Sequence, residues 1–215
     1  MNNIKLKLED IFKTISECYL IDNIPSKSDV INKIQEFADK QFSLLFLDID
    51  GVLNHKLFIE DVSAQENLIK LEKQELISKE KFRIKFYANM IDPEKIKLLN
   101  VLCKDHNIKV VISSTWRKGR TTEQLQELFK YVCATFQIVG KTGGSNHGKR
   151  GLEIYDWLKS LEYSDDAENY TGKYIILDDD SDMLLWQRNN YFHVDGCVGL
   201  TPNICYKIEK YLNGD

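Results

Sequence analysis

The sequence predicts an α/β fold, a doubly wound, Rossmann-like parallel sheet with helices on both faces. The first observation is the apolar run from Leu44 to Leu47, because such runs are typical of strands buried on both faces. The second is the alternation of similar runs with amphipathic segments, which is the pattern of βαβ units. The third is the polar side chains directly after these runs, where open α/β sheets bind ligands.

Four further strands are expected after the first, and each is a short apolar run between helical segments. They cover residues 108–112, 136–139, 174–177 and 191–194. The helices between and after them are expected over residues 93–106, 121–129, 151–161 and 204–212. Asp92 and Pro93 mark a helix N-terminus, with an acidic N-cap before a proline at the first helical position. Thr121 and Gln124 form a capping box for the next helix.

The chain divides into a core domain over residues 42–215 and a helical extension over residues 1–41. The extension contains two segments with apolar residues at helical spacing, and their apolar faces predict contacts with a second copy or a partner protein. Polar residues dominate residues 60–85, which predicts a small helical cap insert over about residues 55–90. Its position after the first strand favours a cap over the site, and the alternative is a solvated hairpin without a role.

The composition excludes several classes of protein. With 43% hydrophobic and 29% charged residues, the chain is an ordinary globular one, and its net charge of −4 gives no global footprint for nucleic acid. No apolar run reaches membrane-spanning length, and residues 1–9 lack the apolar segment of a secretory signal. The five widely spaced cysteines favour reduced thiols. We therefore expect a cytoplasmic protein with no membrane partner.

Two acids follow the first strand directly. Asp48 and Asp50 are followed by Gly51, which permits a sharp turn of the backbone. Burying a carboxylate without a partner is unfavourable, so acids clustered at a strand end favour a bound cation. A lone acid here would be interpreted as a helix N-cap or a turn residue, but two acids after a buried strand make that the weaker interpretation.

Three other segments are expected at the same edge of the sheet. The second strand is followed by Ser113, Ser114 and Thr115, and the fourth by the acidic residues 178–182. Between them, the glycine-rich residues 140–150 precede a helix but lack the Walker spacing, which excludes a P-loop. Carboxylates, hydroxyls and cations together predict phosphoryl transfer with a carboxylate nucleophile, Mg²⁺ and hydrogen-bond donors to the phosphoryl oxygens.

These segments resemble the four ordered motifs of the haloacid dehalogenase-like (HAD) hydrolase superfamily over residues 43–212. In chain order they are Asp-Ile-Asp-Gly-Val-Leu from Asp48, Val-Val-Ile-Ser-Ser-Thr-Trp-Arg ending at Arg117, Lys-Arg-Gly-Leu-Glu-Ile from Lys149, and Ile-Leu-Asp-Asp-Asp-Ser-Asp ending at Asp182. The second and third are most similar to small phage and bacterial HAD domains, including those of Swiss army knife RNA-repair proteins. The resemblance implies a Mg²⁺-dependent phosphatase that uses an aspartyl-phosphate.

The resemblance also implies roles for individual residues of the first two motifs. Asp48 is expected to be the nucleophile and a metal ligand. Asp50 is expected to be the general acid/base and to bind the metal through its backbone carbonyl. Ser114 is expected to bind the phosphoryl group, and Ser113 is an alternative because the register at the strand end is open.

The last two motifs are expected to supply a cation and metal ligands. The cation is Arg150 or Lys149, and the Arg-Gly-x-Glu-Ile spacing favours Arg150, a departure from the commoner lysine. Asp178 is expected to bind the metal directly, with Asp179 or Asp182 completing the acidic set through water.

Thr115 and Arg117 are further candidates for substrate binding. The basic residues 117–120 are interpreted either as contacts to substrate phosphates or as a solvated loop. The substrate is expected to be a phosphorylated small molecule or a nucleic-acid end, and the basic segments favour a nucleotide or a polynucleotide end. The alternative function is a regulatory module that binds phosphate and metal without turnover.

Overall fold

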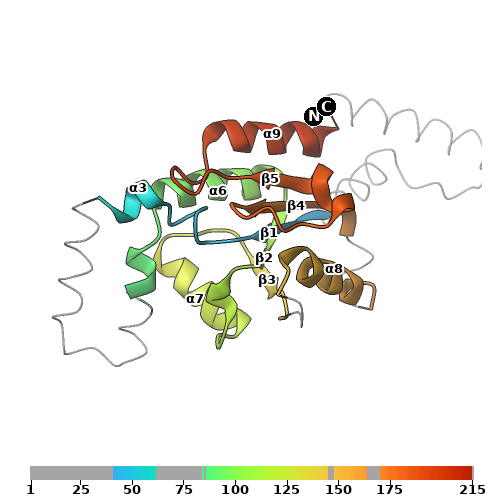
Figure 1. Cartoon of the computed structure of the whole chain (residues 1–215), viewed down its shortest axis with the longest axis horizontal. Helices are drawn as coiled ribbons and strands as arrows, with labels where there is room; N and C mark the ends of the chain where they lie inside the picture. Colours follow the sequence, from blue (N-terminus) through green and yellow to red (C-terminus); the bar gives the residue numbers. More distant parts are fainter. Residues whose placement is uncertain (1–40, 62–83, 85, 145–147, 164–169, 215) are drawn as a thin grey trace, which may run out of the picture. The chain divides into compact units, whose positions relative to one another are not determined.

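The computed structural model describes residues 41–61, 84, 86–144, 148–163 and 170–214 (Figure 1). Its strands form one five-stranded parallel sheet in the order β3-β2-β1-β4-β5. They are β1 (Phe42–Leu47), β2 (Ile108–Ile112), β3 (Ile138–Lys141), β4 (Tyr170–Asp178) and β5 (Tyr191–His193). The predicted α/β fold with a parallel, Rossmann-like sheet is confirmed.

Helices cover both faces of this sheet. They are α6 (Pro93–Asp105), α7 (Thr122–Tyr131), α8 (Arg150–Leu161) and α9 (Pro202–Asn213). The described residues also form the short helix α3 (Lys56–Ile59) and the 3-10 helices η1 (Thr115–Arg117) and η3 (Leu185–Asn190). Helices α6, α7 and α9 share one hydrophobic cluster with one face of the sheet, and α8 packs in a second cluster on the other face. Figure 1 shows the sheet between α6 and α9 on one side and α8 on the other.

Burial on both faces explains the unbroken apolar run of β1. All six of its residues are buried. Leu45 and Leu47 belong to the cluster with α6, whereas Leu44 and Phe46 belong to the cluster with α8. Burial on both faces therefore favours apolar residues at successive positions from Leu44 to Leu47, and the first acid, Asp48, follows directly after the strand.

Local signals place the N-termini of α6 and α7 as predicted, whereas α9 begins two residues earlier than predicted. The Asp92 side chain accepts a hydrogen bond from the backbone N–H of Glu94, and Pro93 opens α6. Thr121 and Gln124 form the predicted capping box of α7. Strand β3 begins two residues later than predicted, at Ile138, and the Phe136 carbonyl before it accepts a hydrogen bond from the Gln126 side chain.

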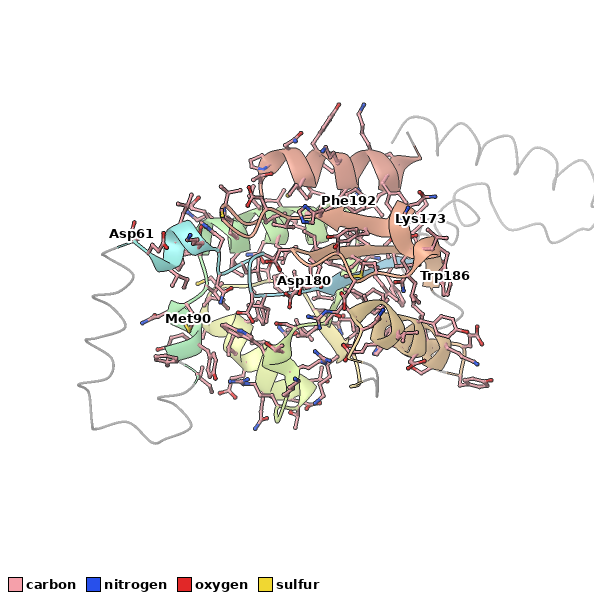
Figure 2. All side chains as sticks on the ribbon, in the orientation of Figure 1. Asp61, Met90, Lys173, Asp180, Trp186 and Phe192 are labelled. Carbon is pink, nitrogen blue, oxygen red and sulfur yellow. The ribbon has the colours of Figure 1, made fainter. Side chains whose placement is uncertain are left out.

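Two predicted parts of the chain fall largely outside the described residues. Residues 1–40 of the expected helical extension do so, and its role in binding a partner or a second copy stays a prediction. So do residues 62–83 and 85 of the expected cap insert. Asp61 and Met90, two described residues of that insert, lie at the end of the view in Figure 2 opposite Lys173 and Trp186. No helix in the described residues could cross a bilayer.

Candidate active site

The carboxyl ends of β1 and β4 bring two acids to the same level of the sheet. Leu47 pairs with Leu177, so Asp48 and Asp178 occupy the next matched positions on neighbouring strands. Side chains at matched positions of parallel strands point to the same face. Figure 2 labels Asp180 in the loop just beyond β4, near the centre of the view.

Three carboxylates form a group that suits a metal ion. Asp48, Asp178 and Asp179 each offer one oxygen, and these three oxygens lie within 4.8 Å of one another. Asp48 and Asp178 are buried, and Asp179 is half-buried. The side chains of Asp50 and Asp182, also expected near the metal, are not part of this group. A set of carboxylate oxygens is the donor chemistry that Mg²⁺ prefers.

The electrostatics of the group also favour a cation. Burial, followed by the charge of Asp178, raises the pKa of Asp48 to about 7, and Arg150 opposes this shift. Burial raises the pKa of Asp178 to about 6, although the backbone N–H of Asp180 and the charge of Arg150 oppose it. These carboxylates are therefore crowded and poorly solvated, and a divalent cation fits there because it would offset both penalties.

Arg150 is the basic residue that the structure places beside the acids. Its Nε donates to Asp178 Oδ2 over 3.1 Å, and its Nη2 lies 3.5 Å from Asp48 Oδ1. Arg150 opens α8, and its backbone N–H donates to Asp182 Oδ2 over 3.0 Å. Lys149, the alternative, is the exposed N-cap residue of the same helix. Asp182 thus bonds the start of α8 rather than joining the acidic group.

The three hydroxyls after β2 have different surroundings. Ser114 is buried, and its hydroxyl forms a hydrogen bond with the Asp48 side chain. Ser113 is also buried, but its hydroxyl has no hydrogen-bond partner among the described residues. Thr115 is exposed, and its Oγ1 donates to Asp50 Oδ2 over 3.2 Å. Of the two serines, Ser114 is thus the one that contacts the expected nucleophile.

Arg117 is surrounded by acceptors from the protein itself. Its guanidinium donates to the backbone carbonyls of Ser114, Thr142 and Gly143 and to Glu153 Oε2, at 2.7–3.0 Å. Only 5% of the residue is exposed. The structure therefore favours a positioning role for Arg117 over the substrate contact predicted from the sequence.

Two residues that the sequence pattern does not single out contact the candidate catalytic residues. Glu153 is buried and lies between two cations, 2.7 Å from Arg117 Nη2 and 3.7 Å from Arg150 Nη1. Asn54 donates to Asp50 Oδ1 over 2.9 Å. The signal for Glu153 is its place one helical turn after Arg150, because residues three apart share a helix face. Asn54 carries no such signal.

Asp179 is packed against glycine backbone. A Cβ added at Gly51 would lie 2.1 Å from Asp179 Oδ2, and one added at Gly196 would lie 2.6 Å from it. Gly51 also has a positive φ of +72°, which other residues rarely adopt. The turn after β1 therefore leaves room for the third carboxylate of the group.

We expect Gly51→Ala to weaken both folding and metal binding. The left-handed backbone alone disfavours alanine by roughly 1–2 kcal/mol, and the new Cβ must also displace the Asp179 carboxylate. Urea unfolding and a Mg²⁺ titration measure the two effects. Gly119→Ala is the matched control, because Gly119 has a φ of +69° but no atom within 4 Å of the added Cβ. If both variants bind Mg²⁺ equally well, Gly51 has no role in placing Asp179.

The fold and the acidic site together define a HAD-like hydrolase domain. Residues 44–204 match the family model described as the HAD domain in Swiss Army Knife RNA repair proteins. Because that match spans most of the chain, the chain belongs to this family, which confirms the resemblance read from the sequence.

The chain is also similar to one solved hydrolase structure at low sequence identity. A haloacid dehalogenase-like family hydrolase from Streptococcus pneumoniae shares 15% sequence identity, with a TM-score of 0.40 over 79% of this chain and 98% of that one. No match to the chain was found among the curated proteins.

Proposed function

We propose that the protein is a Mg²⁺-dependent phosphatase that hydrolyses a phosphomonoester through an aspartyl-phosphate on Asp48. The observation that carries this proposal is the group of three carboxylate oxygens within 4.8 Å, formed by Asp48, Asp178 and Asp179. Arg150 lies directly beside two of these acids. Family membership supports the same reaction class.

The acidic group would hold the metal with Asp48, Asp178 and Asp179. When bound, Mg²⁺ supplies positive charge that draws the phosphoryl oxygens to the nucleophile and stabilises the charge that develops on them. The backbone carbonyl of Asp50 is a further candidate ligand. Arg150 and Ser114 supply hydrogen-bond donors that can bind the phosphoryl oxygens next to Asp48.

In the first step, an oxygen of Asp48 attacks phosphorus. The bond between that oxygen and phosphorus forms while the bond from phosphorus to the leaving oxygen breaks. The leaving oxygen takes the electron pair of the broken bond and a proton from Asp50.

In the second step, water attacks the phosphorus of the aspartyl-phosphate. Asp50, now a carboxylate, accepts the proton of that water. The bond between phosphorus and the Asp48 oxygen breaks, which releases inorganic phosphate and restores both side chains. Asp48 and Asp50 thus have separate roles, consistent with a buried Asp48 and an exposed Asp50.

A nucleotide or a polynucleotide end is the favoured substrate. The family is described from RNA repair proteins, and exposed Lys118 and Lys149 flank the segments that carry Ser114 and Arg150. A screen with Mg²⁺ over 3′- and 5′-phosphorylated oligonucleotides, mononucleotides and sugar phosphates tests this. The highest kcat/KM is expected on a nucleic-acid end. A preference for a sugar phosphate would contradict the substrate class but leave the chemistry intact.

We expect Asp178→Asn to weaken Mg²⁺ binding by at least roughly tenfold, since even residues one shell further out change metal affinity that much. Loss of one anionic oxygen from a three-carboxylate group is the physical reason. The Mg²⁺ concentration that gives half-maximal turnover and direct calorimetric titration both report it. Asp182→Asn is the matched control, because Asp182 lies outside the group and an amide oxygen can still accept from Arg150 N–H. Equal Mg²⁺ affinity in both variants would show that Asp178 is not a ligand of the metal.

A further inference from the structure

The Asp50 carboxylate is held in an asymmetric set of hydrogen bonds. Its Oδ1 accepts from Asn54 Nδ2 over 2.9 Å and from Trp116 Nε1 over 2.9 Å. Its Oδ2 is bonded by the hydroxyl of Thr115 over 3.2 Å. These donors come from the turn after β1 and from η1 after β2, so the carboxylate bridges two segments of the site.

The two carboxylate oxygens of Asp50 differ in whether their hydrogen-bond partners permit them to carry a proton. An indole N–H and an amide NH₂ donate only, so Oδ1 is kept as an acceptor. The hydroxyl of Thr115 can both donate and accept, so Oδ2 can be bonded with or without a proton. Oδ2 is therefore the oxygen on which a transferable proton is compatible with all three neighbours.

We infer that Trp116 and Asn54 are positioning residues that orient Asp50 so that Oδ2 exchanges the proton with the leaving oxygen and the attacking water. This inference rests on the proposed function, in which Asp50 is the general acid/base. Proton transfer depends on the distance and direction between the two heavy atoms, so a carboxylate that rotates freely transfers its proton less often.

Trp116 is itself held firmly enough to serve this purpose. The side chain is 6% exposed, and its ring lies 4.9 Å from the ring of Tyr87 in an edge-to-face contact. Arg120 donates to the Trp116 backbone carbonyl over 2.7 Å, and its guanidinium lies 4.2 Å from the Tyr87 ring centre. Tyr87 lies near the end of the cap insert expected over about residues 55–90, so this aromatic contact links that segment to the acid/base.

Asn54 is positioned by the backbone of the same turn. Its N–H donates to Ile49 O over 3.1 Å, and its carbonyl accepts from Gly51 N over 3.1 Å. Asp50 and Asn54 also form an isolated β-bridge. Because Asp50 and Asn54 belong to the same tight turn, the backbone of that turn holds the Asn54 side-chain amide at a fixed position beside the Asp50 carboxylate.

The test compares a poor and a good leaving group. An alkyl phosphate needs protonation of its leaving oxygen, whereas p-nitrophenyl phosphate has a leaving group stable enough to depart as an anion. General acid catalysis contributes about 10²–10⁴-fold, so partial loss of orientation in Trp116→Phe or Asn54→Ala should lower the ratio of kcat/KM for alkyl over aryl phosphate by roughly tenfold. The parameter kcat/KM is used because it reports the step in which the leaving group departs.

Two further variants make the outcome decisive. Asp50→Asn should lower the same ratio further than either positioning variant. Tyr87→Leu removes the ring that packs on the indole without removing the indole N–H, and should lower the ratio by less than Trp116→Phe does. Asn54→Ala alone decides the matter if Trp116→Phe does not fold.

The outcomes separate the inference from the function on which it rests. If Asp50→Asn leaves the ratio at the wild-type value, the acid/base role of Asp50 is wrong. If Asp50→Asn lowers the ratio but Trp116→Phe and Asn54→Ala do not, Asp50 is the acid/base and our positioning inference is overturned. A selective loss in all three variants, with a smaller selective loss in Tyr87→Leu, supports it.

Discussion

Replacing Asp48 with Asn is expected to lower turnover of an aryl phosphate by roughly 10⁴-fold or more, as removal of a nucleophile does in other enzymes with covalent intermediates. The amide has almost the shape of the carboxylate but does not attack phosphorus. The substitution also removes one negatively charged carboxylate from the group that Asp48 forms with Asp178 and Asp179. Steady-state hydrolysis of p-nitrophenyl phosphate with saturating Mg²⁺ measures the loss.

Folding of the variant is not expected to explain that loss. Burial and the charge of Asp178 raise the pKa of Asp48 to about 7, so its ionised form is unfavourable in the protein without a cation. A neutral amide at this position removes the repulsion with Asp178. Without Mg²⁺, Asp48→Asn should therefore unfold at the same urea concentration as the wild type or a higher one.

A chemical quench distinguishes the proposed phosphatase from a module without turnover. The wild type, stopped during turnover of a ³²P-labelled phosphomonoester, should carry label that hydroxylamine releases, and Asp48→Asn should carry none. Wild-type turnover in the variant would show that Asp48 is not the nucleophile. A wild-type phosphoprotein that persists for minutes without releasing phosphate would instead support the regulatory alternative.

The strands of the sheet were predictable because a strand that is buried on both faces requires a run of apolar residues in the sequence. Every residue of β1 is buried, and the run from Leu44 to Leu47 is apolar without interruption for that reason. Asp48 and Asp178 were predictable as members of one edge of the sheet, since Asp48 follows one buried parallel strand and Asp178 ends another. The order of the strands is not recorded in such runs, because it depends on which helix packs on which face.

Other features of the site depend on which way each side chain points and which atoms it contacts, and a pattern of residue types does not specify either. The sequence favoured Ser114 but left Ser113 open as an alternative, and in the structure the hydroxyl of Ser114 forms a hydrogen bond with Asp48 whereas that of Ser113 has no partner among the described residues. Arg117 looks like a substrate contact in a basic segment, yet the chain's own carbonyls surround it. Asn54 was not predictable, because its role depends on a turn of four residues that brings its amide to Asp50.

Glu153→Gln is expected to destabilise the protein by about 3–5 kcal/mol, the usual effect of removing one partner of a buried ion pair. The side chains of Arg117 and Glu153 are 6% and 8% exposed, and their charged atoms lie 2.7 Å apart. Burial and the nearby charge of Arg150 lower the pKa of Arg117, and Glu153 is the first opposing influence. Without Glu153, two guanidinium groups face each other with little water to separate them.

Urea unfolding gives this free energy, and an exposed ion pair provides the control. Lys97 Nζ and Glu94 Oε1 also lie 2.6 Å apart, but these side chains are 70% and 71% exposed. Lys97→Gln should therefore leave the unfolding midpoint at the wild-type value, because solvent screens exposed pairs. Equal midpoints for Glu153→Gln and the wild type would show that the pair with Arg117 does not stabilise the fold.

Replacing both partners together separates stability from catalysis. A double variant, Arg117→Met with Glu153→Leu, buries no charge without a partner and should recover part of the stability lost in Glu153→Gln. It does not restore the bonds from Arg117 to the carbonyls of Ser114 and Gly143, nor the contact that holds Arg150. The double variant should thus be more stable than Glu153→Gln and still hydrolyse substrate more slowly than the wild type, because Ser114 and Arg150 are no longer held beside Asp48.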